Sequence, residues 1–241
     1  EFIEFQNGEY LEVGEAVGNV ADEAVKRAQI RRTIIDHLQK QLELYPLGIK
    51  VLSLFFIDKV EKYRVYNDDG SWSAGGYARI FEEEYADEVR HGSWRRRYEK
   101  KGVPLPIDPA PLHQGYFSMD GKGKMKDTSG TTAADTSTFE AIMQSKERLI
   151  SFPDGKDDVK DISFIFSHSA LKEGWDNPNI FQICTLVDSG NEFTKRQKIG
   201  RGLRLCVNQQ GERSHDPSVN VLTVIANESY DEFARGLQKE F

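Results

Sequence analysis

Two arginines near the carboxyl end of the chain have the spacing and the chemistry to act on a phosphate. Arg201 and Arg204 occur in QKIGRGLR, which fits the pattern QxxGRxxR with Gln197 and Gly200 in front of them. A spacing of i and i+3 places both side chains on one face of a helix, and a glycine permits a close approach to a neighbouring backbone. A guanidinium supplies permanent positive charge and forked donors, so it can stabilise the charge that develops as a terminal phosphoryl group leaves. The stretch is therefore predicted to reach a nucleoside triphosphate from across a domain interface.

A basic surface helix is the alternative interpretation of these residues. Lys195, Arg196 and Lys198 lie beside them, and basic helices are common and usually solvated. The pattern alone does not separate the two interpretations, so a second segment is needed.

That second segment is SALKEGWDNP, residues 169–178, which directly follows the apolar run 162–166. A strand that runs into a polar turn with a glycine and an aspartate predicts a ligand-facing edge. Gly174 and Asp176 are the two residues concerned, and an ordinary strand-to-helix turn is the alternative for them.

Together the two segments resemble motifs V and VI of superfamily 2 helicases and translocases. The resemblance implies that Arg201 and Arg204 face the phosphates of ATP and complete its site as arginine fingers. It also implies that Gln197 helps to couple the nucleotide state to closure of two lobes. The residues that it places around the nucleotide are Gly174, Asp176, Gln197 and Gly200.

The same resemblance implies a contact with nucleic acid. His168 occupies a position where many relatives have a threonine that touches the backbone of a bound strand. Backbone contacts are therefore expected near His168, Ser169 and Lys172, and such contacts do not themselves read sequence.

Three longer stretches narrow the resemblance to one family. FSHSALKEGWDNPNIFQICTL (166–186), HQGYFSMD (113–120) and SKERLISF (145–152) look like the Res subunits of type III restriction enzymes. The resemblance covers most of residues 45–240 and is strongest over 145–206. It implies the second RecA-like domain of an ATP-dependent motor that, as a whole, cleaves DNA.

The family resemblance also implies the cofactors and partners. ATP and Mg²⁺ would bind mainly to a first RecA-like domain of the same polypeptide, and the isolated chain is expected to be inactive. A nuclease would follow on the carboxyl side. Double-stranded DNA and a methyltransferase (Mod) subunit are the expected partners, in the bacterial cytoplasm. Two alternatives remain open, namely a lobe of a repair-type helicase and a nucleic-acid-binding module without ATPase activity.

Several sequence patterns that would supply a complete active site are absent or poorly matched. No phosphate loop GxxxxGK[ST] occurs, and GKGK at 121–124 lacks both the spacing and the following hydroxyl residue. The acids at 22–25 imitate a magnesium-binding box but begin a helix without a preceding strand. A nuclease-like set of acids and a lysine at 153–160 is too closely spaced for two neighbouring strands. An acidic loop is the preferred interpretation there.

Composition sets further limits. The 241 residues are 38% hydrophobic and 29% charged, enough for a sizeable core. A net charge of −7 argues against a protein that coats nucleic acid by bulk electrostatics. The two cysteines, Cys184 and Cys206, lack CxxC spacing and suit a reducing compartment, and the five histidines form no metal-ligand cluster. No apolar stretch of about eighteen residues is present, so no membrane insertion is expected.

A local basic cluster is compatible with nucleic-acid binding. Its basic and aromatic members are Arg95, Arg96, Arg97, Lys100, Lys101, Trp94 and Tyr98. A solvated helix face, balanced by the acids at 82–88, is the preferred alternative.

The pattern of elements predicts an α/β fold. A β-hairpin is expected around Asn7-Gly8, followed by a long amphipathic helix over 20–45 that Pro46 ends. Strands are expected at 49–57, 113–118, 162–166, 179–187 and 219–226, with helices at 77–101, 138–152 and 230–239 and around the arginines. Strands that alternate with helices predict a RecA-like three-layer domain with a mostly parallel sheet and ligand-binding motifs at the carboxyl ends of the strands. Residues 1–18 form an extension, 19–241 form the domain, and 67–110 form an inserted helical segment.

Overall fold

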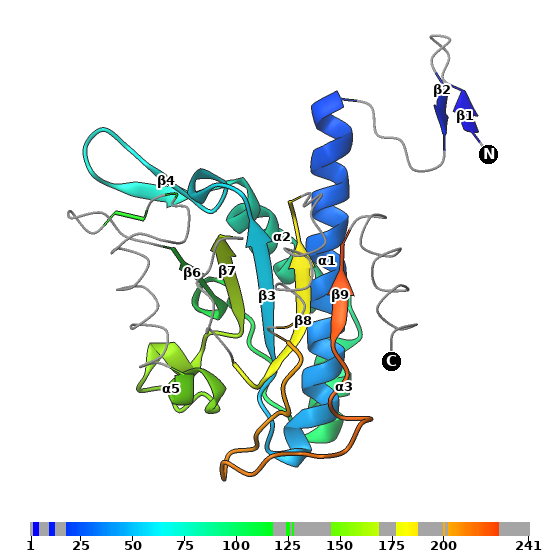
Figure 1. The fold of residues 1–241 in the computed structure, drawn as a ribbon, viewed down its shortest axis with the longest axis vertical. Helices are drawn as coiled ribbons and strands as arrows, with labels where there is room; N and C mark the ends of the chain where they lie inside the picture. Colours follow the sequence, from blue (N-terminus) through cyan, green and yellow to red (C-terminus); the bar gives the residue numbers. More distant parts are fainter. Residues whose placement is uncertain are drawn as a thin grey trace.

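A five-stranded parallel sheet forms the centre of the computed structural model (Figure 1). The described residues are 2–4, 10–12, 18–117, 124, 125, 127, 146–168, 177–187, 200 and 202–226, with side chains described from residue 22 onward except that of His168. The strands lie in the order β6-β7-β3-β8-β9, and each neighbouring pair is parallel. Their bounds are β3 Leu52–Ile57, β6 His113–Tyr116, β7 Phe164–His168, β8 Ile180–Thr185 and β9 Thr223–Ile225. The predicted mostly parallel α/β sheet is confirmed.

The central strand β3 is apolar because both of its faces are covered. All six of its residues are buried, as expected for a parallel strand between two layers. Its single polar side chain, Ser53, donates from Oγ to Oε1 of Gln182 on β8 at 2.8 Å. Burial of that hydroxyl is therefore compensated by a hydrogen bond across the sheet.

Three helices cover one face of the sheet (Figure 1). They are α1 Gly18–Leu44, α2 Gly76–His91 and α3 Trp94–Lys101. The core beneath them is aromatic: the ring centroids of Phe55 and Phe166 lie 4.5 Å apart, and Phe81 of α2 lies 4.7 Å from Phe164. The predicted long helix over 20–45 is confirmed, with Pro46 in the short 3₁₀ helix that follows it, Tyr45–Leu47.

The charged segment expected as one helix over 77–101 forms two helices. The break lies at Gly92, where an added Cβ would approach the carbonyl oxygen of Glu88 to 2.5 Å. Phe81 and Tyr85 of α2 are fully buried in the aromatic core. This segment therefore builds the helical layer and is more than a surface addition.

The opposite face of the sheet carries a smaller and largely aliphatic core. Leu149 of α5, Lys146–Ile150, packs there with Leu54, Phe56 and Ile165. Only the last part of the helix predicted over 138–152 falls within the described residues, and the helix predicted over 230–239 lies outside them.

Two small antiparallel hairpins complete the described fold. Strands β1 Phe2–Glu4 and β2 Tyr10–Glu12 confirm the predicted hairpin at the amino end. Strands β4 Arg64–Tyr66 and β5 Trp72–Ala74 form a second hairpin, which the sequence analysis did not predict.

Candidate functional site

The first motif segment starts at the carboxyl edge of the sheet, as predicted. His168 is the last residue of β7 and pairs in register with Ile57 at the end of β3. Its backbone therefore lies where parallel sheets usually present ligand-binding groups. The other predicted residues of this segment, which are Ser169, Lys172, Gly174 and Asp176, lie outside the described residues.

The same segment re-enters the described structure at the opposite, amino-terminal edge of the sheet. Asn177 directly follows Asp176 in the sequence and is 1% exposed. Its side-chain Oδ1 accepts a hydrogen bond from the backbone N–H of Asn179 at 3.1 Å, immediately before β8 begins. The end of this segment therefore lies at the amino edge, and the placement predicted for Gly174 and Asp176 stays a prediction. The chain must return to the amino edge to start another parallel strand.

The buried side chain of Asn179 joins the two motif segments. Its Nδ2 donates to the carbonyl of Val207 at 2.9 Å and to the carbonyl of Lys50 at 3.0 Å. Its Oδ1 accepts from the N–H of Val207 at 2.9 Å. Val207 lies three residues after Arg204, and Asn179 lies three residues after Asp176. The two motif segments therefore end side by side, and we call this arrangement of Asn179, Lys50 and Val207 the asparagine junction.

The arginine segment departs from the predicted helix. Gly200 is helical, Gly202 lies in a turn and Arg204 lies in a bend, while Gln197 and Arg201 lie outside the described residues. Arg204 is therefore not helical, which does not support the helical spacing predicted for it. After this bend Cys206 is buried, and its N–H donates to Oδ1 of Asn220 at 3.0 Å.

Gly202 packs closely within the described residues, and the close-packing role predicted for Gly200 stays a prediction. An added Cβ at Gly202 would lie 2.5 Å from Cδ1 of Leu222, whereas no atom of the described residues lies within 4 Å of a Cβ added at Gly200. The turn before Arg204 thus packs tightly against the residue before β9. That packing fixes the start of the segment that carries Arg204.

Arg204 itself is exposed, and so is its neighbour Leu203, with 64% of its surface accessible. A guanidinium at the surface can bind a phosphate bidentately.

The sequence did not predict the roles of three asparagines, of which Asn177 and Asn179 are buried and Asn220 is partly buried. Asn177, Asn179 and Asn220 hold the ends of both motif segments through side-chain hydrogen bonds to backbone groups. The available signal was the polar triplet Asn177-Pro178-Asn179 directly before an entirely apolar strand. An amide in that position can satisfy backbone groups that a turn leaves unpaired.

The basic cluster on α3 does not present its aromatic side chains to a ligand. Trp94 and Tyr98 are 5% and 1% exposed and belong to the core. Neither ring can stack on a base, which favours the solvated helix face over the nucleic-acid interpretation.

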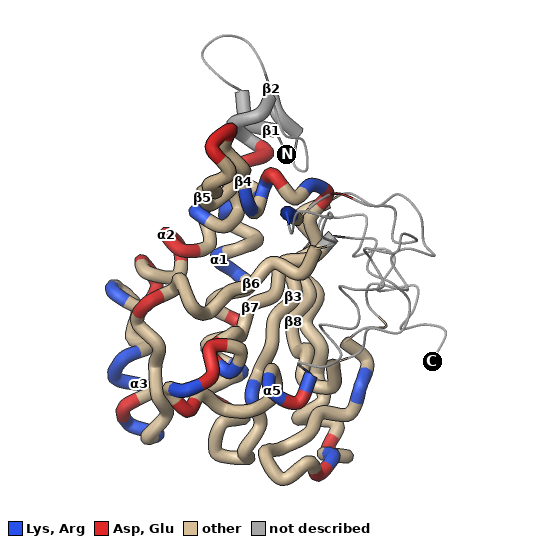
Figure 2. The backbone as a smooth tube through the Cα atoms, turned by 90° about the vertical axis from the view of Figure 1, so that its left-hand side faces the viewer, with Lys and Arg blue, Asp and Glu red and all other residues tan. Residues whose placement is uncertain are grey.

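Three glutamates of α2 form their ion pairs with arginines of α1 and not with the basic residues of α3. Glu83 and Glu84 bind Arg27 of α1, each at 2.8 Å, and Glu88 binds Arg31 at 2.7 Å. The acidic positions of α2 are red along the backbone in Figure 2. The expected balance between these acids and residues 95–101 is therefore wrong. A neighbouring helix offers the acids a closer set of cations.

The nuclease-like acids form a surface loop, as preferred from their spacing. Asp154 binds Nζ of Lys160 at 2.7 Å, and the guanidinium of Arg148 holds the pKa of Asp157 down at about 2. These residues occupy a turn and a short 3₁₀ helix instead of two neighbouring strands.

The remaining sequence expectations concern metals, thiols and membranes. Within the described ranges no group of three or more His, Cys, Asp or Glu side chains could hold a metal ion. Cys184 and Cys206 are both free and buried, and burial raises the pKa of the Cys184 thiol to about 12. Among the described helices, none has the length and apolar character needed to cross a bilayer.

Comparison with known proteins identifies similar sequences. No protein-family model matches the chain. It is 35% identical over 216 residues, 86% of its length, to the Res subunit of the type III restriction-modification enzyme EcoPI of Escherichia phage P1. It is 34% identical over 212 residues, 84% of its length, to the EcoP15I Res subunit of Escherichia coli. The chain spans about a fifth, 20%, of the length of each of these relatives.

Proposed function

We propose that this chain, which is Res-like in sequence, forms the second motor lobe of an ATP-dependent DNA translocase in a type III restriction system. The asparagine junction is the observation that carries the proposal. It joins the residues that directly follow the two motif segments, which supports the proposal that the two segments act together. The similarity to Res subunits over most of the chain supports the same conclusion.

The nucleotide site would be shared between two lobes. This sequence has no phosphate loop, so ATP and Mg²⁺ would be held mainly by a first RecA-like domain, where they supply the phosphoryl group and its counter-charge. Arg201 and Arg204 would neutralise the developing charge on the phosphate oxygens from this side. The exposure of Arg204 and Leu203 suits a surface that the other lobe covers.

The remaining motif residues would have supporting roles. Gly174, Asp176 and Gly200 would lie near the nucleotide, and Gln197 would couple its state to closure of the lobes. Closure and opening would move the protein along duplex DNA, which His168, Ser169 and Lys172 would contact through its backbone. Sequence choice would belong to a Mod methyltransferase subunit.

ATP hydrolysis by the full-length protein tests the proposal. Arg204→Ala is expected to lower DNA-stimulated turnover by a factor on the order of 10³, because an arginine finger contributes 10³ to 10⁵ in related chemistry. DNA binding should be retained. Arg213→Ala, an exposed arginine on the same stretch, is the matched control and should keep normal turnover. Normal ATP hydrolysis by Arg204→Ala would show that the finger assignment is wrong.

A further inference from the structure

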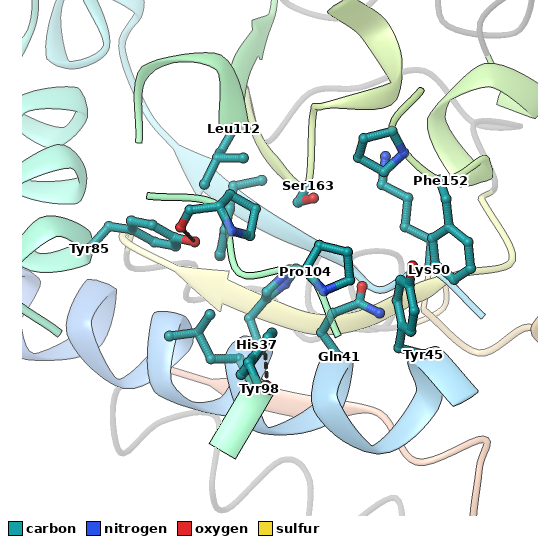
Figure 3. A pocket seen from close by; sticks show the side chains of 14 residues that line it. His37, Gln41, Tyr45, Lys50, Tyr85, Tyr98, Pro104, Leu112, Phe152 and Ser163 are labelled. Carbon is teal, nitrogen blue, oxygen red and sulfur yellow. Dashed lines mark hydrogen bonds between the residues drawn. The ribbon is translucent and has the colours of Figure 1, made fainter. Parts of the chain in front are cut away.

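A cavity of about 160 Å³ lies beneath the amino-terminal ends of β3, β6 and β7, at the edge of the sheet opposite His168 (Figure 3). Helices α1, α2 and α3 and the segments before these strands all contribute to its walls. Its labelled lining residues are His37, Gln41, Tyr45, Lys50, Tyr85, Tyr98, Pro104, Leu112, Phe152 and Ser163.

The walls of the cavity are mostly aromatic and proline rings. The rings of Tyr45 and Phe152 lie 4.4 Å apart between centroids, and the imidazole of His37 lies 4.1 Å from the ring of Phe164. An apolar cavity of about 150 Å³ holds one benzene molecule in another protein, so the volume here suits a single aromatic ring. Flat walls favour a planar ligand over a branched aliphatic one.

His37 presents a hydrogen-bond acceptor at this cavity. Its Nδ1 lies 2.9 Å from Oγ of Ser53, whose proton goes to Oε1 of Gln182. Nδ1 must therefore donate, which leaves Nε2 of the neutral ring as an acceptor. No described residue donates to Nε2. Burial lowers the pKa of His37 to about 3, so the ring stays neutral at physiological pH.

Lys50 presents a buried cation without a paired carboxylate. Its side chain is 2% exposed and lines the cavity, and its Nζ donates to the backbone carbonyl of Lys160 at 2.6 Å. Within the described residues no carboxylate forms an ion pair with it, although Asp157 and Asp161 attract it from a distance. Burial lowers its pKa to about 7. A buried ammonium of this kind is costly unless an anion is brought to it.

We propose that this cavity binds a planar aromatic carboxylate, whose ring lies between the aromatic walls and whose carboxylate pairs with Nζ of Lys50. A donor group on the ring would bind Nε2 of His37. The motif residues assigned to ATP and DNA play no part in this site, so the inference does not depend on the proposed function.

Calorimetric titration of benzoate and of its neutral isostere benzamide tests the inference in the protein that carries this chain. At pH 6 benzoate should bind at least tenfold more tightly than benzamide. Lys50→Met should weaken benzoate at least tenfold and change benzamide less than twofold. Lys156→Met, which removes an exposed lysine, is the matched control and should change neither. Equal affinity for both compounds, or benzoate binding that survives Lys50→Met, would overturn the assignment.

Two further measurements keep the test independent of the folding of one variant. Ser163→Leu should fill the cavity and abolish binding of both compounds. Wild-type affinity for benzoate should fall at least tenfold between pH 6 and pH 9, as Lys50 loses its proton. The charged groups that face Lys50 are Asp157 and Asp161. The pKa of Asp157 is held at about 2 and burial lowers the pKa of His37 to about 3, so neither of these two groups changes charge over that range. A pH-independent affinity, or unchanged binding by Ser163→Leu, would contradict the proposed site.

Discussion

The asparagine junction and the interface between α1 and α2 are both polar, but they differ in how far their polar side chains are buried. At the junction Asn179 is fully buried, and its amide binds three backbone groups. Between the helices Arg27 and Arg31 keep 37% and 45% of their side-chain surface exposed while they bind several acids. Water can replace a lost partner at the interface and cannot do so at the junction. Burial, more than the number of bonds, should therefore decide what each region contributes to stability.

Removal of the buried amide should have the largest effect. Asn179→Ala is expected to lower the free energy of unfolding by about 3 kcal/mol, because it leaves Lys50 and Val207 backbone groups buried without partners. Urea unfolding measures the change. Asn67→Ala, which removes an exposed amide with a bond to Ser71, should cost less than about 0.5 kcal/mol. Equal losses of unfolding free energy in Asn179→Ala and Asn67→Ala would show that burial of the amide does not decide its contribution to stability.

Lys50 adds a pH-dependent effect of intermediate size. Its pKa falls from an ordinary 10.5 to about 7 in the folded state, so between these values the unfolded chain binds more protons. Stability should therefore rise with pH, by roughly 2 kcal/mol between pH 7 and pH 9. Lys50→Met should be more stable than the wild type at pH 7 and should lack this rise. Urea unfolding at both pH values checks it, and parallel pH profiles for the two proteins would rule out the buried cation as the cause.

The ion pairs between the helices should contribute least. Arg31→Met is expected to lower the free energy of unfolding by about 1 kcal/mol or less, because Glu84 keeps Arg27 as a partner and the pairs are partly solvated. The loss should shrink in about 1 M NaCl, where the Debye length is only about 3 Å. Arg32→Met, which breaks an exposed pair with Asp36, is the control and should cost less still. A loss as large as that of Asn179→Ala, independent of salt, would contradict the comparison.

The sequence predicted most of the fold because its patterns are local. The run that becomes β3 is apolar throughout, the period of α1 is helical, and Asn7-Gly8 predicts a hairpin; the structure confirms all three. The break at Gly92 and the hairpin of β4 and β5 were missed. Both lie in a charged or polar stretch, where local patterns carry little information about packing.

The candidate site was predictable only in its residue types. Two motif segments and a family resemblance could be recognised in the chain. The similarity to Res subunits supports the resemblance, and the roles of the two segments stay predictions. Arg204 lies in a bend where a helix was predicted, and the close-packing role of Gly200 stays a prediction. A helix ends where the tertiary fold needs the chain to turn, and here Gly202 and Cys206 mark that turn.

By itself, then, the sequence determined the α/β class, the covered central strand and the presence of two motif segments. These features follow from the local order of apolar and polar residues and from residue type. Only the tertiary structure decided that the motif segments end beside one another at Asn179 and that Lys50 is buried beside a cavity. Those outcomes depend on contacts between residues that are far apart in the sequence. Asn179 is 28 positions from Val207 and 129 positions from Lys50, and it forms hydrogen bonds with both. No local pattern can specify such distant partners.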